Sequence, residues 1–329
     1  MALKLSPSER EVLSCSSLGG DLSILEIANR TKVRAHTVQH ILKKFRDANV
    51  ITWLPRINVH PLGLAYYGIF FSVAATPTQR TRLLELMSAC EELVWLAEFN
   101  GEFRYGVDFV TRTHWEAAKI FQDLLESSKV SLIKKTLATR LSIVDSERRY
   151  LSARRYHPPF VVSEPTAKSY ELSPSERKVL EVISSAGFNS YRQAASIAGM
   201  PHTTFAAKIR ALRKEAILVG SIHAIDSQKF GRESAKLLIT LRSEDLAFRR
   251  QIRNFILDWP ETFHFIESFG EWDYEVNVDV ENERRLRELV DDLFKKFEYR
   301  IDEVKILSGM ATIKRVRFPV SHSYNRDKN

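Results

Sequence analysis

Two stretches of this sequence are almost identical, and the rest of the chain is best understood from them. Leu5-Ser6-Pro7-Ser8-Glu9-Arg10-Glu11-Val12-Leu13 returns as Leu172-Ser173-Pro174-Ser175-Glu176-Arg177-Lys178-Val179-Leu180, with a single difference. Each copy carries a helix-start signal, because a Ser can cap the helix, Pro occupies the first turn, and Glu follows three residues after the cap. The residues after each copy also correspond. We therefore predict a two-part unit fused to a diverged duplicate of itself.

The composition is typical of a soluble globular protein with two or more domains. The chain has 329 residues, of which 44% are hydrophobic and 27% charged. Its apolar runs are shorter than a membrane helix requires, and the first helix signal follows the N-terminus too closely for a signal peptide. Cys15 and Cys90 are expected to be reduced thiols. These features predict a cytoplasmic protein with no membrane partner.

The net charge of +8 is concentrated in two short segments. Residues 1–60 contain nine Lys/Arg and five Asp/Glu, and residues 172–231 contain eight and four, so the remaining residues are neutral. A basic excess confined to one type of module is typical of nucleic-acid binding, although a charge of +4 also fits an ordinary solvated surface.

The first segment shows three helical patterns that fit a helix-turn-helix. The first begins at Ser6 and the second at Ser23, and the third runs from Ala35 to Ala48 with Val38, Leu42 and Phe45 toward the core. In such a fold the second helix of the pair lies in the DNA major groove. A three-helix protein-interaction module with a solvated polar face is the alternative.

The polar face of the third helix and its counterpart supply the predicted DNA contacts. Imidazole, amide and hydroxyl groups suit base edges, and Lys and Arg suit phosphates. The predicted contacts are Lys32, Arg34, His36, Thr37, Gln39, His40, Lys43, Lys44, Arg46, Arg56, His202, Thr203, Lys208, Arg210, Arg213 and Lys214. In the second copy Ala206 and Ala207 replace Gln39 and His40, which suggests that this copy adds affinity more than sequence discrimination.

Each helical segment is followed by a larger one with a different pattern. Residues 49–59 predict a short β hairpin, the wing of a winged helix, with Arg56 at a backbone phosphate. Residues 63–150 then alternate between strand and helix periodicity in the order β-α-β-β-α-β, and the second copy repeats that order. The order is that of a ferredoxin-like domain, whose uncovered sheet face needs a second copy or another chain against it.

These patterns predict an α+β protein in which two winged helix-turn-helix domains alternate with two ferredoxin-like βαββαβ domains. The predicted segments are a first DNA-binding domain at 1–62, a ferredoxin-like domain at 63–150, a linker at 151–171, a second DNA-binding domain at 172–231, a second ferredoxin-like domain at 232–318 and a flexible tail at 319–329.

A Gly-Glu-aromatic-x-Tyr pattern occurs between the middle strands of both larger segments, beginning at Gly101 and Gly270. A hairpin turn that requires a positive φ explains the Gly, and a turn that touches a ligand is an equal alternative.

The whole arrangement resembles the Lrp/AsnC family of transcriptional regulators. The resemblance is carried by Leu5-Ser6-x-x-Glu9, Ile27-Ala28, Ala194-Ala195, Thr37-Val38, Val50-Ile51, Leu62-Gly63, Phe230-Gly231 and the turn from Gly270 to Asp273. It covers nearly the whole chain twice, whereas family members usually have a single unit. It implies a regulator that binds double-stranded DNA, an intramolecular pseudo-dimer within a homo-oligomer, and a small effector of the amino-acid class.

The resemblance also implies an effector site near the turn between the middle strands. Its candidate residues are Glu98, Gly101, Arg104, Gly270 and Asp273. The acidic residue of the family pattern is present as Asp273 but is replaced by Arg104 in the first copy, so the site is expected to be asymmetric.

Two other functions compete with the regulator. Some relatives of the family use the same two-domain build to decarboxylate sirohaem, and His60 could act as a catalytic or haem-contacting imidazole, although the second copy has Gln228 there. An architectural nucleoid-type protein is the other alternative. His36 and His40 have metal-ligand spacing but lack a third ligand nearby, and the sequence has no P-loop, dinucleotide fingerprint or Ser/His/Asp order. The favoured interpretation is therefore a DNA-binding regulator with no enzymatic activity, cofactor or metal.

Overall fold

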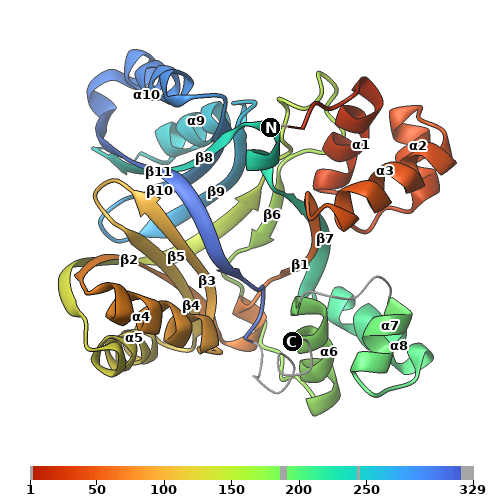
Figure 1. Ribbon diagram of the computed structural model, residues 1–329, viewed down its shortest axis with the longest axis horizontal. Helices are drawn as coiled ribbons and strands as arrows, with labels where there is room; N and C mark the ends of the chain where they lie inside the picture. The colour runs from red at the N-terminus through yellow and green to blue at the C-terminus, as the bar shows by residue number, and fades with distance from the viewer. Residues whose placement is uncertain (1–2, 186–190, 243–244, 320–329) are drawn as a thin grey trace. The chain divides into compact units, whose positions relative to one another are not determined.

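The computed structural model describes residues 3–185, 191–242 and 245–319 (Figure 1). The chain divides into two compact units, and each unit combines parts of both repeats. Unit 1 consists of Met1–Trp53, Ser142–Val162 and Ser221–Met310, and unit 2 consists of Leu54–Leu141, Ser163–Gly220 and the residues from Ala311 onward. Each unit thus joins the helical head of one repeat to the sheet domain of the other. The predicted tail beyond Pro319 lies outside the described residues.

The two helical heads have the expected three helices. In unit 1 these are α1 (Pro7–Ser17), α2 (Ile24–Thr31) and α3 (Ala35–Asp47), and in unit 2 they are α6 (Pro174–Ser184), α7 (Tyr191–Ile197) and α8 (His202–Lys214). Capping boxes start α1, α2 and α6, as the sequence predicts. Arg34 and Pro201 precede α3 and α8 without a side-chain cap, so the polar first turns of these helices keep their N–H groups available.

The sheet domain of unit 2 has the predicted βαββαβ order. Its elements are β2 (Ala65–Ala74), α4 (Pro77–Ala89), β3 (Leu93–Asn100), β4 (Tyr105–Thr111), α5 (His114–Ser128) and β5 (Ser131–Asp145). β2 pairs antiparallel with β4 and β5, and β3 pairs with β4. The helices α4 and α5 cover one face of the sheet, where Leu83, Met87 and Phe121 pack against Phe71 and Val107 (Figure 1).

The sheet domain of unit 1 repeats this order. Its elements are β8 (Glu233–Leu241), α9 (Leu246–Leu257), β9 (Thr262–Phe269), β10 (Tyr274–Val280), α10 (Glu283–Phe297), the 3-10 turn η3 (Glu298–Arg300) and β11 (Ile301–Arg315). β8 pairs antiparallel with β10 and β11, and β9 pairs with β10. The ferredoxin-like architecture predicted for both larger segments is therefore correct.

The long strands β5 and β11 each pass from one unit into the other. The first part of β5 pairs with β2 in unit 2, whereas Val144 near its end belongs to the hydrophobic core of unit 1. Beyond β5, the amide of Ser146 donates to the carbonyl of Phe263 in unit 1 (3.0 Å). Similarly, the amide of Val316, just after β11, donates to the carbonyl of Val94 in unit 2 (2.8 Å). Unit 1 therefore contains the end of β5, and unit 2 contains the end of β11.

The hairpin predicted for residues 49–59 is not formed. These residues contribute one strand, β1 (Ile51–Ile57), which pairs with β7 (Leu218–Ile225) of the second repeat. In unit 1 the amide of Asp226 donates to the carbonyl of Val50 (2.9 Å), and in unit 2 the amide of Asn58 donates to the carbonyl of Ile217 (2.8 Å). The strand finds its hydrogen-bond partners in the other repeat, where local sequence cannot place them.

Residues 151–171 make specific contacts and include the short strand β6 (Phe160–Ser163). The hydroxyl of Ser152 donates to the carboxylate of Glu11 (3.0 Å). The amides of Tyr156 and His157 donate to the buried carboxylate of Glu147 (2.9 and 3.1 Å). This segment is thereby attached to α1 and to the residues after β5 within unit 1.

Cys15 and Cys90 are both free thiols, and burial raises the pKa of each to about 11. Among the described helices, none is both long enough and apolar enough to span a lipid bilayer.

His223 on β7 should make the stability of unit 1 depend on pH. Burial lowers its pKa to about 4 and outweighs its hydrogen bond to the Ser16 carbonyl (3.2 Å), which acts in the opposite direction. The unfolded chain then binds the extra proton between about pH 6.5 and 4, so about 3 kcal/mol of stability should be lost as the pH falls through this window. His223→Gln should flatten the pH dependence of urea unfolding, and His202→Gln, at an exposed position, should not. Identical pH profiles for the parent chain and His223→Gln would refute this assignment.

Candidate functional site

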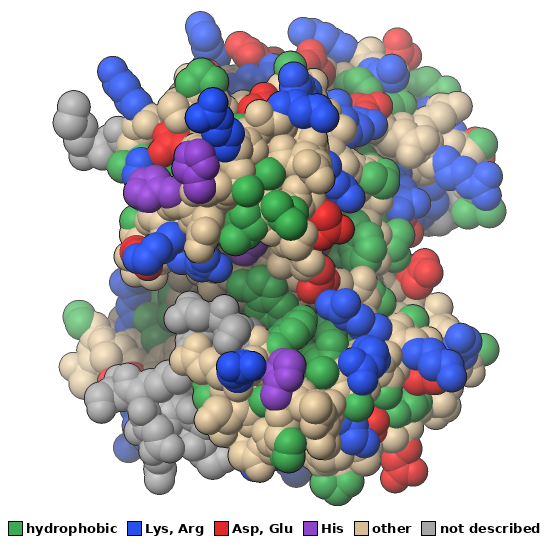
Figure 2. All heavy atoms as spheres, turned by 90° about the vertical axis from the view of Figure 1, so that its right-hand side faces the viewer, with side chains coloured by type: hydrophobic (Ala, Val, Ile, Leu, Met, Phe, Trp, Pro, Cys, Tyr) green, Lys and Arg blue, Asp and Glu red, His purple; other side chains and the backbone are tan. Residues whose placement is uncertain are grey.

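The predicted DNA-contacting residues of the first head lie on an exposed face. His36, Gln39, His40, Lys43 and Arg46 on α3 are exposed, as are Lys32 and Arg34 before it. Figure 2 shows Lys, Arg and His side chains at the surface of the heads. Acidic neighbours already neutralise part of this charge.

Three of the predicted phosphate contacts form ion pairs within their own head. Lys43 pairs with Asp47 (2.6 Å), Lys44 with Glu9 (2.7 Å) and Lys208 with Glu176 (3.4 Å). In the second head His202, Thr203, Arg210, Arg213 and Lys214 are exposed. Contact of these residues with DNA stays a prediction.

The prediction that Arg56 meets a DNA phosphate is wrong. Its side chain is only 2% exposed, so a nucleic-acid backbone cannot reach it. The error follows from the hairpin prediction, which put Arg56 at the tip of a wing, whereas it lies near the end of β1.

The predicted effector residues fall into separate units and make structural contacts there. In unit 2, Glu98 accepts hydrogen bonds from Arg80 and from Arg104 (Nε to Oε1, 3.1 Å for Arg104), and Gly101 adopts a φ of 134°. In unit 1, Asp273 pairs with Arg249 (2.5 Å) and accepts from the amide of Leu241 (2.8 Å), in the turn that Gly270 begins. These bonds fasten each turn to the helix or strand beside it, and an effector role stays a prediction.

Unit 2 contains a cluster of three arginines around Tyr66, which the sequence analysis missed as a group. Side chains alternate between the faces of a strand. Since Tyr67 and Ile69 pack under the helices, Tyr66 and Gly68 point to the opposite face. Arg56, Arg140 and Arg317 all act electrostatically on the hydroxyl of Tyr66. We call these three residues the arginine cluster.

Arg140 is the best-fixed member of the arginine cluster. It is 3% exposed and makes a two-pronged ion pair with Asp108, with both N–O distances at 2.6 Å. Gly68 allows this geometry, because a Cβ there would lie 2.9 Å from the guanidinium. The Arg140 guanidinium also lies 5.9 Å from the ring centre of Trp95.

Arg317 differs from the other two members of the arginine cluster because it is not fully buried. It is half-buried, and in the described part of the chain its buried Nε has no hydrogen-bond acceptor. The bond between Val316 and Val94 positions the backbone beside it, and the buried Phe318 follows. A buried N–H without an acceptor is unfavourable, so Arg317 presents a donor suited to an incoming anion.

The surroundings of the arginine cluster are aromatic and neutral. Burial raises the pKa of Tyr66 to about 12, so its phenol stays protonated, and its hydroxyl donates to the Ile57 carbonyl (3.4 Å). The ring of Phe70 packs against those of Trp95, Phe99 and Phe103 at centroid distances of 6.1 to 6.5 Å. Flat apolar surfaces and guanidinium groups therefore occur together on this face of the sheet.

His60 lies between the strands that carry Arg56 and Tyr66. It begins the 3-10 turn η1 (His60–Leu62), and its backbone amide donates a hydrogen bond to Oδ1 of Asn58 (3.3 Å). Burial lowers the pKa of His60, so its imidazole is neutral at pH 7. A neutral imidazole can accept a proton or coordinate a metal.

The corresponding face of the unit 1 sheet carries different side chains in the described residues. β10 presents Glu275, Asn277 and Asp279 there, and Glu275 forms a buried ion pair with Lys236 (2.7 Å). Lys236 occupies the position that corresponds to Gly68, and Gly309 the one that corresponds to Arg140. The two sheet domains therefore have the same strand arrangement but different side chains on this face.

No family model and no curated protein matches this sequence. Among solved structures, the sirohaem decarboxylase NirDL matches with a TM-score of 0.60 and 11% identity, over 97% of this chain and 96% of that chain. The same enzyme in complex with an iron-uroporphyrin III analogue matches with a TM-score of 0.59 and 11% identity, over 92% and 90%. An AsnC family transcriptional regulator from Agrobacterium tumefaciens matches with a TM-score of 0.39 and 18% identity, over 44% of this chain and 94% of that chain.

The comparison corrects the prediction of a DNA-binding regulator without enzymatic activity. The sirohaem decarboxylase structure, which matches 97% of this chain, is that of an enzyme. The duplicated arrangement inferred from the repeat is shared with that enzyme along nearly the full length of both chains. This chain therefore has the fold of the sirohaem decarboxylase NirDL.

Proposed function

We propose that this chain is an enzyme that decarboxylates a carboxylate-rich tetrapyrrole of the sirohaem type. The observation that carries the proposal is the match of nearly the whole chain to a sirohaem decarboxylase. This activity was the alternative that the resemblance to sirohaem-decarboxylating relatives and the presence of His60 suggested from the sequence.

The arginine cluster fits such a substrate. A guanidinium binds a carboxylate through two parallel hydrogen bonds, and Arg317 has a buried N–H that lacks an acceptor among the described residues. The half-buried ring of Trp95 offers a flat surface to a planar macrocycle. We therefore assign the binding of a substrate carboxylate to Arg317, the half-buried member of the arginine cluster in unit 2.

The reaction needs one proton at a defined place. The bond between a side-chain carbon and its carboxylate breaks, carbon dioxide leaves, and the electron pair left on the carbon takes up a proton. Arg317 would hold a carboxylate that does not react. His60 is the proposed proton-transfer residue: its neutral imidazole would take up a proton from water and pass that proton to the carbon, because the hydroxyl of Tyr66 is already engaged with the Ile57 carbonyl.

The direct test is to incubate the purified full-length chain with sirohaem under anaerobic conditions and to follow the product by mass spectrometry. The expected product has lost carbon dioxide, and binding should change the absorption spectrum of the tetrapyrrole. Recovery of unchanged sirohaem, at protein concentrations that bind it fully, would refute the proposal.

His60→Gln gives a prediction about the chemical step, because Gln is what the second repeat has at this position. The variant should bind iron-uroporphyrin III normally but decarboxylate sirohaem about 10²- to 10⁴-fold more slowly, as expected when a proton-transfer group is lost. The control is His114→Gln, at an exposed helix start. An unchanged rate in His60→Gln would exclude His60 from the reaction.

A further inference from the structure

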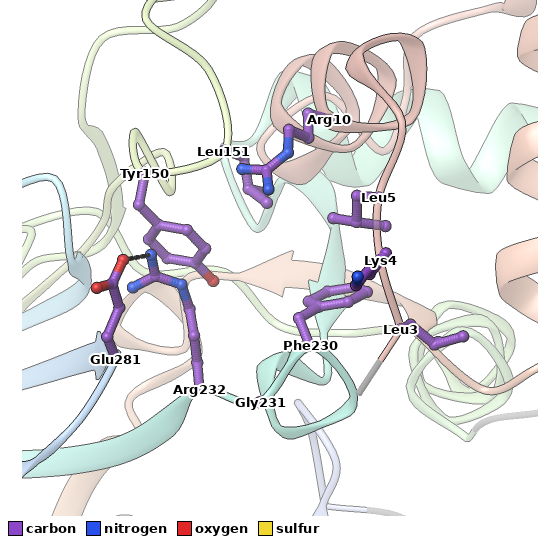
Figure 3. A pocket seen from close by; sticks show the side chains of 10 residues that line it. All are labelled: Leu3, Lys4, Leu5, Arg10, Tyr150, Leu151, Phe230, Gly231, Arg232 and Glu281. Carbon is purple, nitrogen blue, oxygen red and sulfur yellow. Dashed lines mark hydrogen bonds and ion pairs between the residues drawn. The ribbon is translucent and has the colours of Figure 1, made fainter. Parts of the chain in front are cut away.

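Unit 1 contains a cavity that is separate from the residues assigned to tetrapyrrole binding. Its volume is about 590 Å³, within the range of about 300–1,000 Å³ typical of small-molecule sites. Figure 3 shows that the chain before α1, the residues after β5, and the stretch from the 3-10 turn η2 (Ser227–Phe230) into β8 all contribute side chains to it.

One wall of this cavity is held rigidly. The hydroxyl of Tyr150 donates to the buried carboxylate of Asp279 (3.0 Å), and the Arg232 guanidinium lies 3.8 Å from the centre of the Tyr150 ring. Arg232 also donates to the carbonyl of Asp279 (3.1 Å) and pairs with Glu281 (3.0 Å). Burial raises the pKa of Tyr150 well above its usual value, so this wall presents a neutral phenol. The geometry exists before any ligand arrives.

The opposite side of the cavity carries two cations that have no acidic neighbour in contact. Within residues 3–185, 191–242 and 245–319, the side chains of Lys4 and Arg10 make no hydrogen bond or ion pair. The only acid that lines the cavity in these residues is Glu281, and Arg232 already binds it. The lining therefore has an excess of positive charge that favours an anion.

Apolar side chains occupy the space beside the cations. Leu5, Leu151 and Phe230 line the cavity, and Figure 3 shows Leu5 and Leu151 close to Arg10. An inorganic anion would leave this surface uncovered, whereas a molecule with an anionic head and an apolar body would contact both parts.

The second repeat does not preserve this chemistry. Glu171 corresponds to Lys4 and Leu64 to Arg232, although Arg177 corresponds to Arg10. The basic lining is thus a property of one copy and is not a general feature of the helical heads.

We propose that this cavity binds a small amphipathic anion, with its carboxylate or phosphate head at Arg10 and Lys4 and its apolar part against Leu5, Leu151 and Phe230. The ligand would connect the start of α1 to the residues that lead into β8, within unit 1. This site is independent of the decarboxylase proposal, whose residues lie in unit 2.

The test uses 8-anilino-1-naphthalenesulfonate, an aromatic anion whose fluorescence rises on binding, and the full-length chain. The double variant Lys4→Gln/Arg10→Gln should bind this probe about tenfold more weakly than the parent chain, as expected for the loss of charge-assisted contacts. Arg177→Gln is the matched control in the other repeat and should leave the affinity unchanged. Both altered residues of the double variant are exposed, so circular dichroism should confirm that it folds normally.

Competition identifies the class of ligand. Octanoate should displace the probe from the parent chain, whereas octanol and inorganic phosphate at equal concentrations should not. Equal affinity of the double variant and the Arg177→Gln variant for the probe, or equal displacement by octanol and octanoate, would overturn the proposal. Arg317→Met, which alters the proposed substrate site, should retain probe binding, so the two proposals can fail separately.

Discussion

Asp279→Ala is expected to lower the free energy of unfolding by about 3–5 kcal/mol, because it removes one partner of a buried ion pair. Asp279 is fully buried on β10. Its Oδ2 accepts from Arg148 Nε (2.7 Å) and from the Tyr150 hydroxyl, and its Oδ1 accepts from Ser227 (2.9 Å) and Ser234 (2.6 Å). Burial acts to lower the pKa of Arg148, but Asp279, Tyr150 and Asp145 together outweigh it and the pKa is raised. The variant would leave a charged guanidinium buried without its carboxylate.

Urea unfolding followed by circular dichroism measures this difference. The control is Asp258→Ala, which removes an acid of the same type at an exposed ion pair with Arg155 (3.0 Å). Because solvent screens such a pair, that change should cost less than about 1 kcal/mol. Equal losses in the two variants would mean that the four hydrogen bonds at Asp279 do not stabilise unit 1.

Arg317→Met should weaken the binding of iron-uroporphyrin III by about 10- to 100-fold, the range expected for the loss of hydrogen bonds to a charged group. Because its Nε has no acceptor among the described residues, the substitution removes no intramolecular bond from that atom. The folded chain should therefore keep its stability to within about 1 kcal/mol. An absorbance titration measures the affinity, and urea unfolding measures the stability.

The control for Arg317→Met is Arg82→Met on α4, where the side chain is 58% exposed and its guanidinium lies 4.0 Å from the Glu85 carboxylate. This variant should bind iron-uroporphyrin III as the parent chain does. If both variants retained full affinity, Arg317 would have no part in substrate binding and its assignment would be withdrawn.

The local elements could be predicted from the sequence because their signals are short-range. The pairs Ser6/Glu9 and Ser173/Glu176 specify helix starts through bonds that span three residues. The spacing of Val38, Leu42 and Phe45 places a helix face in the core, and all three are buried. The alternation of strand and helix periods gave the βαββαβ order twice.

Pairing between distant strands could not be predicted in this way. Residues 51–57 have strand character, and the nearest available partner along the sequence suggested a hairpin. The actual partner, β7, begins more than 150 residues later. Hydrogen-bond satisfaction determines that a strand must pair, but it does not specify with which segment.

The arginine cluster escaped prediction for a related reason. Arg56, Arg140 and Arg317 are far apart in the sequence, and each is flanked by residues that suit a strand. The net positive charge lies in the two heads, so charge alone points to them. A segment with no net charge can still contain buried arginines, because acids such as Asp108 balance their charge. The Gly at position 68, in the middle of an apolar strand, was the available signal of a close approach.

The exchange of strand ends through β5 and β11 has a consequence for how this protein is made. Unit 1 contains the first residues of the chain but also requires residues up to Met310. A nascent chain emerging from the ribosome cannot complete this unit until residues up to Met310 have emerged, so the first head must wait for them with part of its apolar surface exposed. Assistance by a chaperone that shields such surfaces would be of greatest use during that interval.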